Sequence, residues 1–166
     1  MFKMKGSLMM AGTLLALVGG LALGAEADTQ KQIDDLKAAI PKFAVPMREV
    51  GDRFQDMDAA VKGGNWALAA YMSKYMNNAM NPARLTKPDE YKLWQKFYEN
   101  AFAATNKAIQ AKDAKAFEAS YTAVINDCNG CHAAMGYLFI KVVRQAAPSD
   151  QGIDYEVRSE PGDVPK

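Results

Sequence analysis

The chain has 166 residues, 49% hydrophobic and 23% charged, which is enough apolar material for one domain with a buried core. Alanine, lysine, methionine and leucine are common and β-branched residues are sparse, which favours an all-α protein. With 20 basic and 19 acidic residues the chain is nearly neutral, and this balance argues against nucleic acid or an anionic membrane surface as a partner.

Residues 1–27 have the anatomy of a secretory signal peptide. Two lysines precede an uncharged apolar run from Leu8 to Leu23, and Ala25-Glu26-Ala27 fits the small-x-small cleavage pattern. The run is slightly short for a membrane-spanning helix, which needs about 20 apolar residues. An uncleaved membrane anchor is the alternative. We expect export to the periplasm, cleavage, a mature start near Asp28 and no membrane span afterwards.

The first predicted helix runs from about Thr29 to Lys62. Its apolar residues recur in steps of three and four, which is typical of a helix in a bundle. They are Ile33, Leu36, Ile40, Phe43, Met47, Val50, Phe54, Met57 and Val61. Pro41 and Pro46 fall off this stripe, and because the register is unbroken we expect each to kink the helix without ending it. Gly63-Gly64 is the predicted end.

Three further helices follow in chain order. The second is expected over residues 65–80 with Asn65 as its N-cap, and the third over about residues 86–111. The fourth begins at its cap Asp113 and is expected to continue past residue 132 to about Gln145.

Four helices with short connections predict an antiparallel up-down-up-down four-helix bundle. The expected organisation is a signal peptide over residues 1–27, the bundle domain over residues 28–147 and an extended C-terminal tail over residues 148–166. The tail is polar and carries three prolines, which is why no helix is expected there.

The segment Cys128-Asn129-Gly130-Cys131-His132 carries the chemistry. In a C-x-x-C-H motif the two thiols add to the vinyl groups of a haem, and the histidine binds the iron. These are the only two cysteines and the only histidine of the chain. A disulfide or redox pair would call for an α/β context, and a zinc site for a fourth ligand. The sequence therefore predicts one covalent haem c on the last helix, held by Cys128 and Cys131, with His132 as axial ligand.

A C-x-x-C-H motif near the end of a four-helix chain resembles the cytochrome c′ class, whose haem is attached to the last helix of an antiparallel bundle. The resemblance covers roughly residues 29–146 and rests on Cys128, Cys131, His132 and the helix pattern. It implies a haem inside the bundle. Its sixth position is empty in high-spin members and filled by a first-helix methionine in low-spin members. Homodimers through the first two helices are common in the class, where Trp66 and Tyr71 are candidates to face a partner.

The register of the bundle points to Met47 as the sixth ligand. Cys131 lies about 27 Å along the last helix from its cap, at 1.5 Å per residue. The first helix is antiparallel to the last, and the same distance back from its C-terminal end reaches the neighbourhood of Met47. Met76 and Met80 compete for this role, because the second helix runs parallel to the last. For every methionine the alternative is core filling.

Pro46 directly precedes Met47 and suggests a hypothesis. A proline there would leave the carbonyl of Lys42 without its helical hydrogen bond, and the resulting kink would set the distance between thioether and iron. Replacing Pro46 by alanine is then expected to alter the haem spectrum.

The leading functional prediction is a periplasmic monohaem c-type cytochrome that passes single electrons between redox partner proteins. A Met/His haem has a raised potential, which suits this role. An enzyme is not expected, because no constellation of general acid and base is visible. The alternative is a five-coordinate, cytochrome c′-like protein that binds NO or CO. A third interpretation is a subunit of a larger electron-transfer complex that docks through the 148–166 tail.

Overall fold

The computed structural model describes residues 26–165, and the chain divides into two compact units at Ile40 and Pro41. In the first unit residues 26–39 are helical, and the N–H of Ile40 still donates to the carbonyl of Leu36 at 3.2 Å. The apolar run of the predicted signal peptide lies outside the described residues. Among the helices that are described, none has the length and apolar character needed to cross a membrane.

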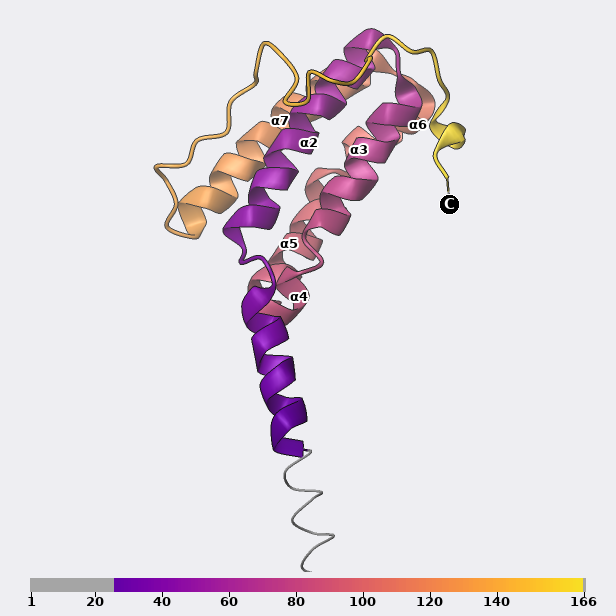
Figure 1. Cartoon of the computed structure of the whole chain (residues 1–166). Helices are drawn as coiled ribbons and strands as arrows, with labels where there is room; N and C mark the ends of the chain where they lie inside the picture. Colours follow the sequence, from indigo (N-terminus) through magenta and orange to yellow (C-terminus); the bar gives the residue numbers. More distant parts are fainter. Residues whose placement is uncertain (1–25, 166) are drawn as a thin grey trace, which may run out of the picture. The chain divides into compact units, whose positions relative to one another are not determined.

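The second unit is built from helices, so the prediction of an all-α protein is confirmed for residues 26–165 (Figure 1). The elements are α2 (Ala44–Gly63), α3 (Trp66–Ala79), α4 (Ala83–Thr86), α5 (Pro88–Ala101), α6 (Ala103–Ala111), α7 (Ala114–Ala134) and the 3-10 turn η1 (Pro161–Asp163). One isolated β-bridge joins Asn65 to Ser159.

Helices α2 and α3 form a hairpin that turns at two glycines. Gly64 takes a left-handed conformation with φ of 82°, which a residue with a side chain adopts only at a cost. Asn65 caps α3, as predicted, by accepting a hydrogen bond from the N–H of Leu68 at 3.1 Å. In the same way Asp113 caps α7 by accepting from the N–H of Ala116 at 2.9 Å.

The third predicted helix is two helices, α5 and α6, separated at Phe102. This residue is 1% exposed, and its ring meets that of Phe54 edge-on with centroids 5.8 Å apart. The periodic pattern over residues 86–111 therefore runs through a break in the helix, at a phenylalanine whose side chain is buried in the core. Helix α6 packs against both α7 and α3.

Pro41 ends a helix and does not kink one, which corrects the expectation of a continuous first helix. Residues 40–43 leave the helical conformation, because proline has no N–H to donate and disfavours helix in the residue before it. Pro46 lies in the first turn of α2, where a missing N–H costs no helical hydrogen bond. The carbonyl of Lys42 accepts from the N–H of Val45 at 2.9 Å, so the predicted kink at Pro46 is wrong.

The last helix ends at Ala134, about eleven residues before the predicted end at Gln145. Gly136, with φ of 83°, closes it in a Schellman arrangement. The N–H of Tyr137 donates to the carbonyl of His132 at 2.7 Å, and that of Gly136 to Ala133 at 3.2 Å. Residues 137–160 then run back over the helices as an irregular segment with several turns, drawn in orange and yellow in Figure 1.

The core of the second unit fixes how α2 and α7 face each other. The ring of Tyr121 in α7 stacks on that of Phe54 in α2 at 4.0 Å and 7°, and the Tyr121 hydroxyl donates to the carbonyl of Phe54 at 3.3 Å. Arg144 joins Asp58, four residues after Phe54, to Glu118, three residues before Tyr121. The two helices therefore run antiparallel, with the end of α7 near the beginning of α2 (Figure 1).

Candidate functional site

The C-x-x-C-H motif occupies the last two turns of α7. Cys128 and Cys131 are both free thiols. Their spacing of three places them on one face of the helix, and His132 follows on the same face one turn after Cys128. Cys128 is half-buried against the core of the second unit, whereas Cys131 is exposed. The three side chains that the sequence assigns to haem thus share one helix face.

The two thiols differ in their surroundings. Burial, together with the nearby Cys131 and Asp127, raises the pKa of the Cys128 thiol to about 12. Cys128 is therefore a neutral thiol at physiological pH, which lets it lie against apolar side chains without the cost of a buried charge.

His132 has a fixed tautomer. Its Nδ1 atom lies 2.9 Å from the carbonyl oxygen of Ile140. A carbonyl only accepts hydrogen bonds, so this network assigns the proton to Nδ1. The lone pair is then on Nε2, the nitrogen left available to a metal. A metal-bound histidine characteristically donates its other ring N–H to a backbone carbonyl or a carboxylate in this manner.

The carbonyl of Ile140 belongs to residues 137–144, which we call the return segment because they fold back along α7. The side chain of Asn129, inside the motif, holds this segment by two hydrogen bonds to Val142. Its Nδ2 donates to the Val142 carbonyl at 2.9 Å, and its Oδ1 accepts from the Val142 N–H at 2.8 Å. Motif and return segment are therefore joined at both Asn129 and His132.

Arg144 anchors the far end of the return segment. Its Nη2 lies 2.6 Å from Oδ1 of Asp58, it also pairs with Glu118, and its guanidinium lies 4.8 Å from the ring centre of Tyr121. Burial opposes ionisation of Asp58, but hydrogen bonds from Arg144 and Lys62 outweigh it and lower the pKa of this carboxyl. Arg144 also lowers the pKa of Glu118.

Met47 lies in the first turns of α2, partly buried against the core. The stacked rings of Phe54 and Tyr121 show how far along α2 Met47 lies relative to the motif on α7. Seven residues back from Phe54 is Met47, and seven residues on from Tyr121 is Cys128. Because the helices are antiparallel, both steps go the same way and each covers about 10.5 Å. Met47 and Cys128 are therefore level along the two helices.

The competing methionines of α3 are deeper in the core. Met76 and Met80 are both 0% exposed and belong to the same buried cluster as Met57. Burial of this kind is the ordinary use of methionine. Met135, just after the motif, is 42% exposed.

The exposed surface around the motif is unusually apolar. In the return segment and the residue pair before it, six large apolar side chains are more than two-fifths exposed. They are Met135, Tyr137, Leu138, Phe139, Ile140 and Val143. Phe139 reaches 82% and Leu138 77%.

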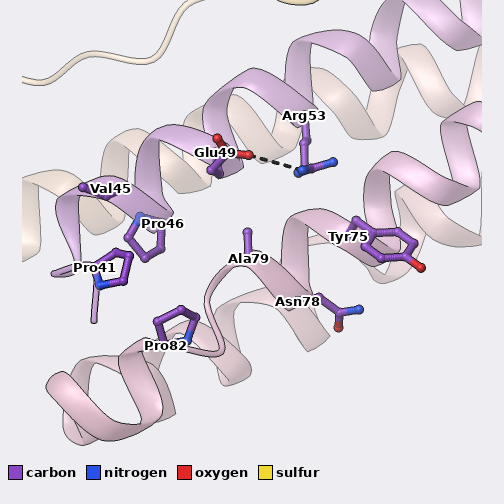
Figure 2. A pocket seen from close by; sticks show the side chains of 9 residues that line it. All are labelled: Pro41, Val45, Pro46, Glu49, Arg53, Tyr75, Asn78, Ala79 and Pro82. Atoms are coloured by element: carbon purple, nitrogen blue, oxygen red, sulfur yellow. Dashed lines mark hydrogen bonds and ion pairs between the residues drawn. The ribbon is translucent and has the colours of Figure 1, made fainter. Parts of the chain in front are cut away.

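Two open hollows lie elsewhere on the second unit. One of about 320 Å³ lies between the first turns of α2 and the end of α3, with Pro46 and Pro82 at one end and Tyr75 at the other (Figure 2). On its α2 side Arg53 pairs with Glu49 at 3.2 Å. The other, of about 270 Å³, lies over Ser73 of α3. Neither contains a residue that the sequence assigns to haem.

A cluster of three or more His, Cys, Asp and Glu side chains able to hold a metal ion is not found in residues 26–165. Such a cluster is the signature of a site whose metal is bound by protein alone. The iron of a haem is held mainly by the porphyrin, with one or two axial side chains from the protein.

No family model, no curated protein and no solved structure matches this chain. The case for its function therefore rests on its own residues.

Sequence reasoning found the motif and missed the segment that supports it. The return segment was expected to be helix, so neither the Asn129–Val142 pair nor the Ile140 acceptor was foreseen. The available signal was Gly136, which has the position and conformation of a helix-ending glycine. Asn129, a poor helix former inside the motif, was a second signal.

Proposed function

We propose that this chain is an exported monohaem c-type cytochrome, similar to the low-spin branch of the cytochrome c′ class, and that it transfers single electrons. Cys128 and Cys131 bind the haem covalently, His132 is the axial ligand, and Met47 is the sixth ligand. Haem, when bound, supplies the one-electron iron couple. The chain supplies attachment, axial ligands and an apolar surrounding.

The observation that carries the proposal is the state of the three motif side chains. Two free thiols and an imidazole lie on one helix face, and the hydrogen bond from Nδ1 to Ile140 leaves Nε2 for iron. A disulfide pair would not need a histidine in this tautomer. The donor set therefore fits a haem held through two thioethers and one imidazole.

The architecture supports the same class. Helices α2, α3 and α7, with α5 and α6 counted together as one interrupted helix, would be the four members of the proposed antiparallel bundle. The motif then falls on the last member, at the end of the bundle where α2 begins. The class uses this arrangement to hold the haem between helices.

Attachment is tested on the full chain, secreted with its own leader from a host that matures c-type cytochromes. We expect a mass increase equal to one haem that survives denaturation, and its loss in a Cys128→Ser, Cys131→Ser double variant. Recovery of a haem-free wild-type chain from a host that loads a control cytochrome would refute the proposal.

Ligation by Met47 is tested with Met47→Leu, which keeps the volume and removes the thioether. The wild-type spectrum is expected to be low-spin with a Met–Fe(III) charge-transfer band, and the variant is expected to lose that band. Met57→Leu, ten residues or about three turns further along the same helix, is the matched control and should keep the band.

Two other outcomes would change the assignment. Loss of the band in Met76→Leu or Met80→Leu, with Met47→Leu unaffected, would move the sixth ligand to α3. A five-coordinate, high-spin spectrum in the wild type would replace electron transfer by the binding of NO or CO.

A further inference from the structure

Two side chains of the motif bind the return segment, and both their positions in the motif and their partners in the segment lie close together in sequence. Asn129 holds the backbone of Val142, and His132 donates to the carbonyl of Ile140, two residues earlier. The position of the Ile140 carbonyl therefore depends on the neighbouring peptide that Asn129 fixes.

Asn129 is well suited to fix a peptide unit. Its carboxamide offers one donor and one acceptor, and both are used on the same residue, at 2.9 and 2.8 Å. Such a two-point contact restricts rotation as well as separation, which a single hydrogen bond does not do.

Before Ile140 the return segment is held by its own backbone, because the N–H of Ile140 donates to the carbonyl of Tyr137 at 2.8 Å and the N–H of Tyr137 donates to the carbonyl of His132 at 2.7 Å. Leu138 and Phe139 are 77% and 82% exposed, and the next anchor along the chain is Arg144 on Asp58. After Ile140, the Asn129 side chain is thus the nearest contact that ties the segment to α7.

From these contacts we infer that Asn129 is a positioning residue for the axial histidine. By holding Val142, it keeps the Ile140 carbonyl in place as acceptor for Nδ1–H of His132, and so fixes the orientation, tautomer and electron donation of the imidazole. This inference rests on the proposed haem attachment for its redox consequence, whereas its structural part concerns the chain alone.

The redox consequence has a definite sign. A hydrogen bond from Nδ1–H to a carbonyl increases the basicity of the imidazole, which favours Fe(III) over Fe(II) and lowers the reduction potential. Loss of the Asn129 contact is therefore expected to raise the potential of the haem-loaded chain.

The test compares Asn129→Ala with Asn126→Ala, an exposed asparagine earlier on the same helix, in the full chain. In the chain produced without haem, the single histidine makes its ¹⁵N spectrum easy to assign. We expect wild type and Asn126→Ala to carry the His132 proton on Nδ1. Asn129→Ala should show a population with the proton on Nε2 and faster hydrogen exchange at the Val142 amide.

In the haem-loaded chain, Asn129→Ala is expected to shift the reduction potential upward, and Asn126→Ala to leave it unchanged. Asn129→Asp keeps the acceptor for the Val142 N–H and loses the donor to its carbonyl, so hydrogen exchange at the Val142 amide is expected to lie between the rates of wild type and Asn129→Ala. This conservative variant also keeps the test valid if the alanine variant folds poorly.

The inference is overturned if Asn129→Ala accelerates exchange at Val142 but leaves the His132 tautomer and the potential as in wild type, because Asn129 would then act only on stability. Unchanged exchange at Val142 would overturn it as well. If no haem is attached to the wild-type chain, the proposed function fails, while the tautomer and exchange measurements still decide the structural part.

Discussion

Cys128 and Cys131 belong to one motif but occupy different environments, and this difference can be measured. Only the thiolate reacts with an alkylating agent. Burial raises the pKa of Cys128 to about 12, whereas Cys131 is exposed. In the haem-free chain we therefore expect a short pulse of iodoacetamide at neutral pH to label Cys131 much faster than Cys128.

The labelling is read by mass spectrometry of the peptide that contains both cysteines, with Cys131→Ser used to isolate Cys128. Labelling of Cys128 should increase steadily as the pH is raised towards its pKa, because the thiolate fraction grows about tenfold per pH unit below it. Equal rates for the two thiols at neutral pH would contradict the assigned burial of Cys128.

Among the charged residues at the surface of the second unit, we expect the replacement of Arg144 to reduce stability most, because Arg144 pairs with both Asp58 and Glu118. Its removal leaves the Asp58 side chain, 6% exposed, with Lys62 as its remaining ion-pair partner. We expect Arg144→Gln to lower the free energy of unfolding by about 2 kcal/mol, the range for removing one partner of a part-buried charge pair. Urea denaturation measures the change.

The matched control is Arg48→Gln, since Arg48 is 85% exposed and its nearest contact with Asp52 is 4.0 Å.

The pH dependence of this stabilisation follows from the lowered pKa of Asp58. Stabilisation by this carboxylate is present above its unfolded pKa of about 3.9 and is lost as the pH falls through the lower folded value. The difference between wild type and Arg144→Gln should therefore shrink in acid; a constant difference would argue against the ion pair as its source.

At the scale of elements, the most constrained contact is between the end of α2 and the C-terminal tail. A Cβ atom on Gly63 would meet the carbonyl oxygen of Tyr155 at 2.0 Å, well inside van der Waals contact. We expect Gly63→Ala to displace the tail from α2, and limited proteolysis to cut the tail faster than in wild type.

Gly51 provides the control for this substitution. It lies inside the same helix, and a Cβ there would meet nothing within 4 Å. Gly51→Ala is therefore expected to stabilise the helix by about 0.5–1 kcal/mol and to leave the proteolysis pattern unchanged. Equal tail cleavage in wild type and Gly63→Ala would show that the tail does not depend on this contact.

The helices themselves were predictable where local chemistry decides them. The stripe from Val50 to Val61, the turn at Gly63-Gly64 and the caps Asn65 and Asp113 are all local signals, and each is present in the structure. Phe102 was not predictable in the same way. Its stripe position suits a continuous helix, whereas in the structure the helix is interrupted there and the ring packs against Phe54 of another element.

At the scale of the whole second unit, the tail over residues 148–165 closes one end of the helices. The buried carboxylate of Asp56 accepts from the N–H of Ser149 at 2.8 Å and from the hydroxyl of Tyr155 at 2.9 Å, and Lys112 pairs with Glu160 at 2.7 Å. These contacts favour a structural role for the tail.

We therefore expect truncation after Ala147 to lower the midpoint of urea unfolding, because Asp56 loses the donors that satisfy it. The haem spectrum should be unaffected, since the tail binds at the end of α2 opposite to Met47. An unchanged midpoint together with loss of a copurifying partner would instead favour the tail as a docking element.

Some features of the candidate site follow from local sequence, and others depend on tertiary contacts. The sequence by itself determined the motif, its place on a final helix and the helical character of the chain, because these depend on residue spacing within about two turns. A count of residues along two antiparallel helices also predicted Met47 as the candidate sixth ligand. The level of Met47 with Cys128 depends on the Phe54–Tyr121 stack, a contact between residues 67 positions apart.

Only the tertiary structure decided what surrounds His132. The Ile140 carbonyl that accepts from His132, and the N–H and carbonyl of Val142 that bind Asn129, are backbone groups. Every residue has a backbone carbonyl, so the sequence does not indicate which donor a given carbonyl will bind. The positions of these backbone groups follow from the reversal of the chain at Gly136 and from the anchoring of Arg144 on α2 and α7. Spacing can therefore mark His132 as a candidate ligand, but the group that orients its imidazole is decided by how the chain folds back.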